Sequence, residues 1–277
     1  MTEIQSKLLD MLVWFDGYCR ENNLRYYALG GTLLGAVRHG GFIPWDDDVD
    51  VGMPRKDYER LAQLMGSEIH SGYVLETEYS EDRKYCYPYS KLYDTTTTLS
   101  EHVSTGLKRG LFLDVFPLDG LGNGKEPDWN WYHRIQRRYA FYLARVTAVR
   151  KGRSFIKNLA VLAAKAIPDR IADNTAMRKK ISRMCAKYDF DASEWAGTMT
   201  EDLGDTGIVP RAWFGRPADY PFEGHTILGA EHADEFLTSL FGDWRQLPPE
   251  EKRVTNHDFI ECDLHRSYLS SSSTGDY

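Results

Sequence analysis

The sequence predicts an α+β fold, with α/β as the alternative, in which a small mixed sheet is combined with helices. In the first 127 residues, short strand candidates alternate with amphipathic helices. From residue 128 to 187 the pattern is helical throughout, and Pro168 is its one clear break. A hydrophobic content of 42% with 13% aromatic residues is sufficient for a core, which excludes disorder for most of the chain.

The elements of the first part follow from spacing and from turn residues. Apolar residues recur at helical spacing in residues 3–22, and a short strand is expected at 25–29. A Gly-Gly turn then leads into one or two helical turns that run through Arg38. A strand at 49–53 continues an acidic segment, and Pro54 stands at the first position of the next helix. Further strand candidates are 73–79, 85–93 and 111–116.

The second part is predicted to begin with basic helices and to return to short strands. Within the helical region an apolar stripe is flanked by basic residues; its members are Ile156, Leu159, Ala160, Leu162, Ala163 and Ile167. Short strands are expected at 197–200, 213–220 and 225–228, with a helix at 231–241. The organisation predicted is a catalytic core at 1–127, a basic helical region at 128–190, a C-terminal part at 191–266 that completes the fold, and a polar, disordered tail at 267–277.

Charge is distributed unevenly along the chain. The net charge is −7, but residues 133–183 contain 14 Lys and Arg against 2 Asp, a local charge of +12. This asymmetry favours an anionic partner for the helical region, and the alternative is a set of solvated helix faces. No apolar run approaches the roughly 20 residues that span a bilayer, the N-terminus does not resemble a signal peptide, and the four cysteines form no C-x-x-C pair. We therefore expect a cytoplasmic protein.

Residues 46–50 read DDDVD, which is the most informative segment of the chain. In an extended strand, Asp46, Asp48 and Asp50 would share one face, because successive side chains alternate. Three like charges on one face repel unless a cation lies against them, and hard oxygen ligands favour Mg²⁺ or Mn²⁺. A solvated acidic turn is the alternative interpretation.

Two other segments are expected to complete this site. Asp114 interrupts an otherwise apolar strand, where a buried carboxylate is costly unless a metal satisfies it. Asp119, in what is predicted to be the following turn, is expected to be a turn or capping residue. The sequence Gly30-Gly31-Thr32 is suited to presenting backbone N–H groups to a phosphate at the start of a helix, although any tight turn can use such a sequence.

These segments occur in an order that resembles the nucleotidyltransferase superfamily of the DNA polymerase β type. More narrowly, GGTLLGAVRHGGFIPWDDDVDV at 30–51 resembles the LicD family, which includes bacterial phosphocholine transferases and fukutin-related proteins. The segments SKLYDTTTT, GLFLDVFPLDG and FGDWRQLPPEEKRVTNHD resemble later blocks of that family. The resemblance implies a nucleotidyltransferase-like fold carrying a helical insert. It also implies a metal-dependent transfer of a phospho-alcohol from CDP-choline or another CDP-alcohol to a glycan or lipid-linked glycan hydroxyl, with release of CMP.

The resemblance also implies roles for individual residues. Asp46, Asp48 and Asp50 match the acidic triplet that would hold Mg²⁺ (or Mn²⁺), and Asp114 matches a later acid that serves as a further ligand or as the base. The residues expected to contact substrate are Gly30, Gly31, Thr32, Arg38, His39 and Lys91. For Arg38 the alternative is a cation at a helix C-terminus, for His39 a helix cap, and for Lys91 a surface lysine. His257 is a weaker candidate that has a structural alternative.

Alternative functions remain open on the sequence alone. The same turn and acids would serve a nucleotidyltransferase that uses an NTP and releases pyrophosphate, and a non-catalytic binding protein of the same fold is a third reading. The basic helical region is open to contact with an anionic membrane surface at the inner membrane face, to recognition of a lipid-linked glycan, or to a role in shaping the acceptor pocket. No nucleic-acid-reading motif is found, so no nucleic-acid partner is expected.

Overall fold

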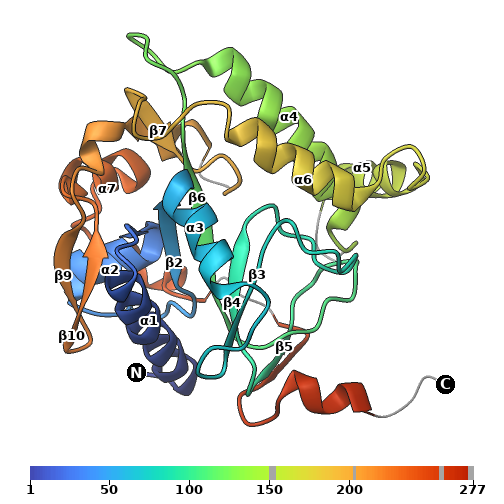
Figure 1. The fold of residues 1–277 in the computed structure, drawn as a ribbon, viewed down its shortest axis with the longest axis horizontal. Helices are drawn as coiled ribbons and strands as arrows, with labels where there is room; N and C mark the ends of the chain where they lie inside the picture. The colour runs from blue at the N-terminus through green and yellow to red at the C-terminus, as the bar shows by residue number, and fades with distance from the viewer. Residues whose placement is uncertain (150–153, 202–203, 256–258, 274–277) are drawn as a thin grey trace.

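The computed structural model describes residues 1–149, 154–201, 204–255 and 259–273. A mixed sheet crosses the molecule, with the order β1-β2-β6-β4-β3 and with β7 and β8 attached through β6 (Figure 1). The β2–β6 pair is parallel, whereas β1–β2, β6–β4, β4–β3 and β6–β7 are antiparallel. The prediction of a mixed sheet combined with helices is confirmed.

The N-terminal part supplies most of this sheet. Its helices and strands are α1 (Glu3–Glu21), β1 (Tyr27–Ala28), α2 (Gly30–His39), β2 (Asp50–Pro54), α3 (Arg55–Met65), β3 (Tyr73–Glu76), β4 (Ser90–Asp94), β5 (Thr98–Ser100) and β6 (Phe112–Gly120). Helix α1 begins with a capping box in which Thr2 accepts from the backbone N–H of Gln5. The two glycines predicted to form a turn before α2 are instead its first two residues. Pro54, predicted at the first helical position, ends β2 and caps α3.

The middle of the chain forms three helices: α4 (Trp129–Val146), α5 (Phe155–Lys165) and α6 (Asn174–Cys185). Pro168 lies between α5 and α6, and a second interruption separates α4 from α5. Helices α4 and α6 contribute Tyr132, Ile135, Tyr142 and Ile181 to a core cluster of their own, which also contains residues of the neighbouring loops. The helical region is therefore packed onto the rest of the protein through a dedicated apolar contact.

Two arginines of the basic helical region are buried and have structural roles. Arg145 donates to the carbonyl oxygens of Ala164 and Ile167, each at 2.7 Å, and so holds the C-terminal end of α5. Arg178 donates to the carbonyl oxygens of Glu78 and Tyr85, which ties α6 to the loop between β3 and β4. Buried guanidinium groups that are satisfied by backbone carbonyls fix the positions of these segments.

The C-terminal part returns to the main sheet. Its strands are β7 (Trp195–Gly197), β8 (Ile208–Pro210), β9 (Ala218–Phe222), β10 (His225–Gly229) and β11 (Glu261–Asp263); its helices are η1 (Gly204–Gly207), η2 (Arg211–Trp213), α7 (Ala233–Phe241), η3 (Glu250–Lys252) and η4 (Tyr268–Ser273). Of the strand predicted at 213–220, only residues 218–220 are extended, at the start of β9; Trp213 ends η2, and residues 214–217 are neither helix nor strand. Residues 268–273, predicted to be disordered, form η4, because Tyr268 donates its N–H to Thr97 and Ser267 its hydroxyl to Thr95. Residues 274–277 lie outside the described residues.

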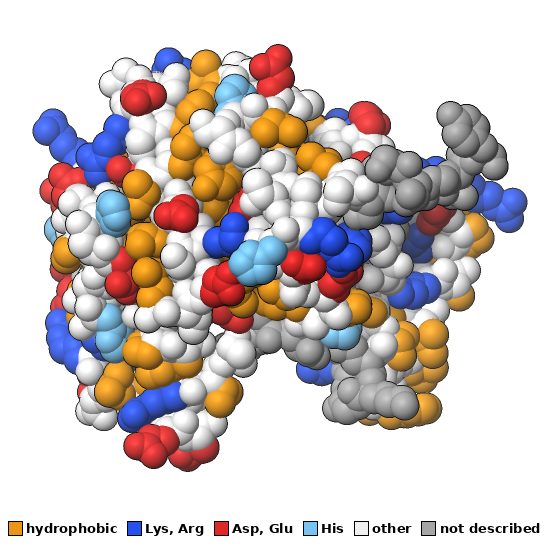
Figure 2. Space-filling view, turned by 90° about the horizontal axis from the view of Figure 1, so that it is seen from below, with side chains coloured by type: hydrophobic (Ala, Val, Ile, Leu, Met, Phe, Trp, Pro, Cys, Tyr) orange, Lys and Arg blue, Asp and Glu red, His pale blue; other side chains and the backbone are white. Residues whose placement is uncertain are grey.

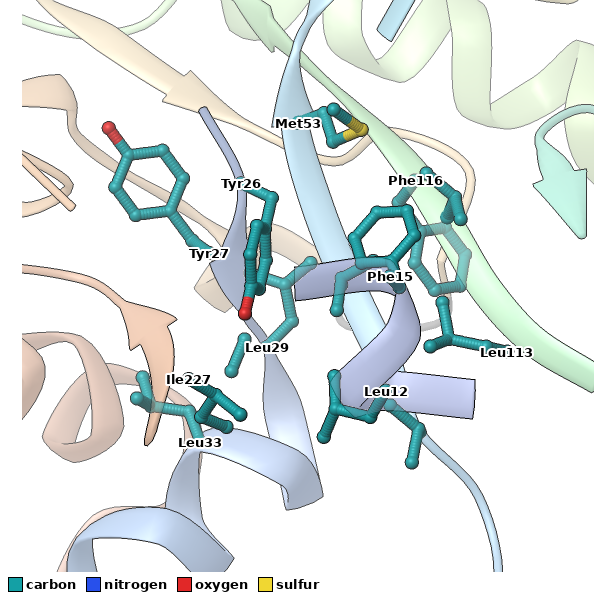
Figure 3. Packing of buried hydrophobic residues seen from close by; sticks show 14 of the residues in the cluster. Leu12, Phe15, Tyr26, Tyr27, Leu29, Leu33, Met53, Leu113, Phe116 and Ile227 are labelled. Atoms are coloured by element: carbon teal, nitrogen blue, oxygen red, sulfur yellow. The ribbon is translucent and has the colours of Figure 1, made fainter. Parts of the chain in front are cut away.

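The main core joins segments that are far apart in sequence. Figure 3 shows Leu12 and Phe15 of α1 packed against Leu113 and Phe116 of β6, with Ile227 of β10 on the other side of the cluster. All five side chains are buried. At about 25 cal/mol per Å² of apolar area removed from water, this burial is the main force that holds the sheet against α1 and β10.

A buried ion pair secures the parallel strand pair from the side of α3. Arg55 donates to both carboxylate oxygens of Asp119, at 2.8 and 2.6 Å, and Ser182 of α6 donates to Glu78 at 2.6 Å in the same cluster. Asp119 was predicted to be a turn or capping residue, but it lies inside β6 and is fully buried. The prediction was wrong because β6 continues past Pro117, and the charge of Asp119 is satisfied by a guanidinium that the local sequence does not reveal.

We predict that Asp119→Ala destabilises the protein by about 3–5 kcal/mol, because removing one partner of a buried pair leaves Arg55 uncompensated. Urea denaturation measures the free energy of unfolding. The matched control is Glu81→Ala, which removes the exposed partner of Lys179 and is expected to cost less than about 1 kcal/mol. Equal losses in the two variants would contradict the structural role of Asp119.

Candidate active site

Strand register brings three of the predicted site residues into one row. Asp50 of β2 pairs with Asp114 of β6 in the parallel ladder, and Lys91 of β4 pairs with Asp114 in the antiparallel ladder. Directly paired residues of adjacent strands project to the same face, and the strands lie about 4.8 Å apart. The sheet therefore places two carboxylates and one ammonium group side by side, from three strands that are not consecutive in the sequence.

Lys91 compensates the charge of Asp114. Its Nζ lies 3.1 Å from Oδ1 of Asp114 and 3.3 Å from Oε2 of Glu101, and its side chain is 1% exposed. It also lies over the ring of Phe112, with Nζ 3.2 Å from the centroid. Burial by itself would lower the pKa of Lys91, but the carboxylates of Asp114 and Glu101 raise it, so the lysine stays charged. The sequence did not indicate the contribution of Glu101.

Asp50 is the most crowded carboxylate of the site. Burial raises its pKa well above the usual range, and the charges of Asp48, Glu201, Asp114 and Asp46 raise it further. Among the described residues, no ion pair offsets the charge of Asp50. Burial also raises the pKa of Asp114, to about 6, although Lys91 opposes the shift. The site thus concentrates more negative charge than its own lysine neutralises.

Glu201 is a member of this cluster that sequence reasoning missed. Burial raises its pKa to about 8, and the charges of Asp114 and Asp48 add to the shift. One of its carboxylate oxygens, Oε2, is buried without a hydrogen-bond partner among the described residues. Glu201 follows β7 and reaches the site because β7 pairs with the far end of β6. The sequence around Glu201 does not indicate this position, since a single glutamate after a short strand forms no recognisable motif.

The glycines of α2 allow the carboxylates to approach the helix N-terminus. A Cβ on Gly31 would lie 2.5 Å from Oδ2 of Asp46, and a Cβ on Gly30 would lie 3.8 Å from both Oδ2 of Asp50 and Oε1 of Glu201. Gly30 also has a φ of +44°, a conformation that other residues rarely adopt. The free N–H groups at a helix N-terminus favour nearby negative charge, so α2 stabilises the cluster. Contact of this turn with a phosphate stays a prediction.

Thr32 fixes the start of β2. Its hydroxyl accepts a hydrogen bond from the backbone N–H of Asp50 at 2.9 Å, and the residue is buried. This contact holds the first residue of β2 against the first turn of α2. Thr32 was predicted to contact substrate; the structure shows that its hydroxyl is engaged with the backbone of an acidic residue.

The acidic segment is not one continuous strand. β2 begins at Asp50, so Asp46 and Asp48 lie in the loop that precedes it, and their predicted alternation on one strand face is wrong. Gln5 of α1 shapes this loop by donating to the carbonyl oxygens of Ile43 and Asp46, at 3.3 and 2.8 Å. The loop still directs charge to the site, because Asp48 and Asp46 both raise the pKa of Asp50.

Arg38 and His39 lie at the opposite end of α2 from the acids. Arg38 lies eight positions after Gly30, which corresponds to about 12 Å along a helix. Arg38 donates to the carbonyl oxygen of Trp244 at 2.7 Å and to Nε2 of His39 at 3.0 Å. The structure therefore does not bring this pair to the carboxylates, and its contact with substrate stays a prediction. His257 lies outside the described residues.

The chemistry of the cluster fits a divalent cation, but the side chains are not arranged around one. Five carboxylates crowd one end of the β2–β6 pair, and a buried oxygen of Glu201 has no partner among the described residues. Across the described ranges, however, no three His, Cys, Asp or Glu side chains are grouped so that they could hold a metal ion. Metal binding therefore remains a proposal that rests on charge and on ligand type.

Comparison with known proteins tests the resemblance to the LicD family. Residues 23–146 match the model described as "LicD/FKTN/FKRP, nucleotidyltransferase domain". These residues form a LicD-family domain. The match includes the glycine turn, the acidic loop and the strand of Asp114, and it continues into α4, past the predicted boundary at residue 127. The predicted resemblance is confirmed.

The names of two relatives bear on the activity of this chain. It is 29% identical over 264 residues to "Lipopolysaccharide cholinephosphotransferase LicD" of Haemophilus influenzae, which covers 93% of this chain and 96% of the relative. It is 47% identical over 55 residues to "Ribitol 5-phosphate transferase FKRP" of Homo sapiens, which covers 20% of this chain and 11% of that protein. Both relatives are named as transferases of a phosphorylated alcohol, which confirms the prediction of a LicD-type phosphotransferase at the level of the family.

We predict that the stability of the cation-free protein falls as the pH rises from 4.5 to about 8. Glu201 has a raised pKa in the folded state, so the folded protein binds its proton more tightly than the unfolded chain does, and this stabilisation is lost as Glu201 ionises. In Glu201→Gln the fall is expected to be smaller by more than about 1.4 kcal/mol, the equivalent of one pKa unit.

Chemical denaturation in EDTA at several pH values measures this difference. The exposed Glu194→Gln serves as the control and is expected to keep the wild-type slope. Identical slopes in wild type and Glu201→Gln would show that Glu201 is not in the crowded environment described.

Proposed function

We propose that the chain transfers a phospho-alcohol such as phosphocholine from a CDP-activated donor to a hydroxyl of a cell-surface glycan or teichoic-acid-type precursor, and that it releases CMP. The observation that carries the proposal is the row of Asp50, Asp114 and Lys91 in a LicD-family domain. The names of the relatives support the class of group transferred and a glycan acceptor. A nucleotidyltransferase-like fold and a cytoplasmic location are parts of the same proposal.

The proposed reaction is a displacement at the phosphorus that bears the alcohol. The acceptor hydroxyl oxygen forms a bond to this phosphorus while the bond from the phosphorus to the bridging oxygen breaks. CMP departs with the bridging oxygen and its electron pair, and the hydroxyl proton passes to a carboxylate of the enzyme. Positioning and charge stabilisation supply most of the catalysis in reactions of this type.

Asp114 is suited to accept that proton. A pKa raised to about 6 lies close to neutral pH, where a general base is most effective. Lys91 limits the rise by its ion pair with Asp114, and a second ion pair with Glu101 fixes the position of the lysine. We therefore assign Lys91 first to positioning Asp114; its predicted contact with the diphosphate requires that this pair rearrange.

Asp46, Asp48, Asp50 and Glu201 are the residues that would hold Mg²⁺ or Mn²⁺, with Asp114 at the edge of the group. When bound, such an ion neutralises charge on the diphosphate oxygens. In this chain the N-terminus of α2 lies against the same carboxylates, and its N–H groups would bind a phosphate oxygen. The glycines permit a close approach there because they carry no Cβ.

We predict that Asp50→Asn lowers turnover at least about a hundredfold, because the loss of one carboxylate misplaces the cation and the phosphate that it orients. Folding is expected to be retained, and stability to rise as charge repulsion falls. The assay incubates purified protein with Mg²⁺, CDP-choline and a glycan acceptor and measures CMP; CDP-ribitol and CDP-glycerol are tested in parallel. Asp234→Asn, which removes an exposed ion-pair partner of Arg245, is the control.

The leaving group distinguishes the proposal from nucleotidyl transfer. Release of pyrophosphate from an NTP, with no CMP from any CDP-alcohol, would replace the transferase by a nucleotidyltransferase. Wild-type activity in Asp50→Asn would remove this aspartate from the site. An inactive wild-type protein with an unchanged cellular phenotype for Asp48→Ala combined with Asp50→Ala would favour a non-catalytic binding protein.

We predict that Mg²⁺ binds the wild-type protein and stabilises it increasingly as the pH rises to about 8, because cation binding competes with protonation of Asp114 and Glu201. Isothermal titration calorimetry with MgCl₂ measures the affinity and the protons released. Asp50→Asn is expected to weaken the affinity at least tenfold, whereas Asp234→Asn leaves it unchanged. An absence of heat and of thermal stabilisation in the wild type would remove the metal from the proposal.

A further inference from the structure

Helix α5 presents its apolar side chains to solvent. Phe155 is 80% exposed and Ile156 76% exposed, and Leu159 and Leu162 are each 54% exposed. Only Val161 and Ala164 of this helix are buried. The sequence predicted an apolar stripe on this helix; in the structure the helix rests on Val161 and Ala164, and most of the predicted stripe is exposed. Exposed apolar groups in such a contiguous arrangement mark an interaction surface.

A basic groove borders the segment that follows this helix. It has a volume of about 930 Å³ and is formed by α4, α6 and the segment between α5 and α6, with Arg134, Arg137, Arg138, Arg170 and Lys180 among the residues that line it. Ile171, which is 72% exposed, lies in the same lining. Apolar and cationic groups are thus adjacent on the helical region.

The acids of the groove do not neutralise these cations. Asp169 lies 2.8 Å from the buried Arg145, and Asp173 pairs with Arg83 and caps α6. No ion pair is found for Arg137 or Arg138 in the part of the chain that the structure describes. Helix α5 itself carries Lys157 and Lys165 and no acidic residue. The helical region therefore displays a net positive field around an apolar helix face.

From this combination we propose that the helical region docks on an anionic phospholipid surface. Helix α5 would lie in the plane of the interface, with Phe155, Ile156, Leu159 and Leu162 among the acyl chains. Arg137, Arg138 and their neighbours in the groove would face the lipid phosphates, to which guanidinium groups donate paired hydrogen bonds. Figure 1 places α5 at the edge of the molecule, and Figure 2 shows hydrophobic side chains gathered on that same side.

The positive charge of the groove favours an anionic membrane over a second copy of the chain as the partner of this surface. A two-fold contact through α5 would bring two like-charged grooves together, which is unfavourable. An anionic bilayer offers both an apolar interior for the helix face and phosphates for the groove. No helix of the described residues is long and apolar enough to cross a membrane, so the contact proposed is peripheral.

The test is flotation of the purified full chain with vesicles of phosphatidylcholine alone and of phosphatidylcholine with 30% phosphatidylglycerol, as a rough working fraction. The wild type is expected to float with the anionic vesicles only, and less so in high salt. Ile156→Asp combined with Leu159→Asp is expected to reduce binding at least about tenfold, because a charge on the apolar face opposes insertion. Both residues are exposed, so folding is retained, as thermal unfolding verifies.

Two control variants separate this surface from general effects. Ile69→Asp places a charge at a site that is 53% exposed after α3, and it is expected to bind as the wild type does. Arg137→Glu combined with Arg138→Glu is expected to abolish anionic preference, whereas the same charge change at the exposed Arg60 and Lys84 is expected to leave it largely intact.

Three results would overturn the proposal. The first is that the wild type does not float with anionic vesicles, and the second is that Ile156→Asp/Leu159→Asp binds vesicles as well as the wild type does. The third is that the wild type sediments as a dimer without lipid and that this double variant is a monomer. Vesicle binding is measured without donor or acceptor, so it stands or fails independently of the proposed transferase activity.

Discussion

The crowding of carboxylates at the start of the β2–β6 pair is the constraint on which the rest of the site depends. Asp50 and Asp114 are direct neighbours in a parallel ladder, and Glu201 approaches them from another segment. Like charges in a buried setting repel, so the fold has to supply compensation. Lys91 supplies one positive charge, and the N-terminus of α2 supplies partial charge. The remaining excess of negative charge is the basis for the proposal that a cation, and through it a phosphate, binds here.

The surrounding structure fixes this unfavourable arrangement in place. Thr32 binds the backbone N–H of Asp50, and Gln5 binds the carbonyl of Asp46, so both the strand and the loop are anchored by neutral contacts. Near the C-terminal end of β6, the ion pair of Arg55 and Asp119 holds this strand to α3. An unfavourable arrangement persists when the surrounding structure holds it in place. Here the residues that hold it, Thr32, Gln5 and Arg55, belong to three different helices.

The helical region combines two uses of positive charge. Arg145 and Arg178 are buried and bind backbone carbonyls, which fixes α5 and α6. The cations of the groove remain at the surface beside an apolar helix. Sequence composition gives only the total number of basic residues in this region. The local excess could therefore be predicted, but not which of these residues are buried and which lie at the surface. The exposure of the α5 stripe could not be predicted for a related reason: amphipathic spacing defines an apolar face of a helix but not the partner that covers it.

What the sequence by itself determined was the mixed class of fold, α1, the acidic segment as a candidate site, and Asp114 as a polar residue in an apolar strand. These are local signals, since spacing, turn chemistry and a charge among apolar neighbours are visible within a few residues. Only the tertiary structure decided that Lys91 neutralises Asp114, that Glu201 joins the cluster, that Asp119 pairs with Arg55, and that Arg38 lies away from the acids. Each of these depends on strand register or on a contact across many residues of chain, and such contacts are selected by the packing of the whole sheet rather than by any one segment.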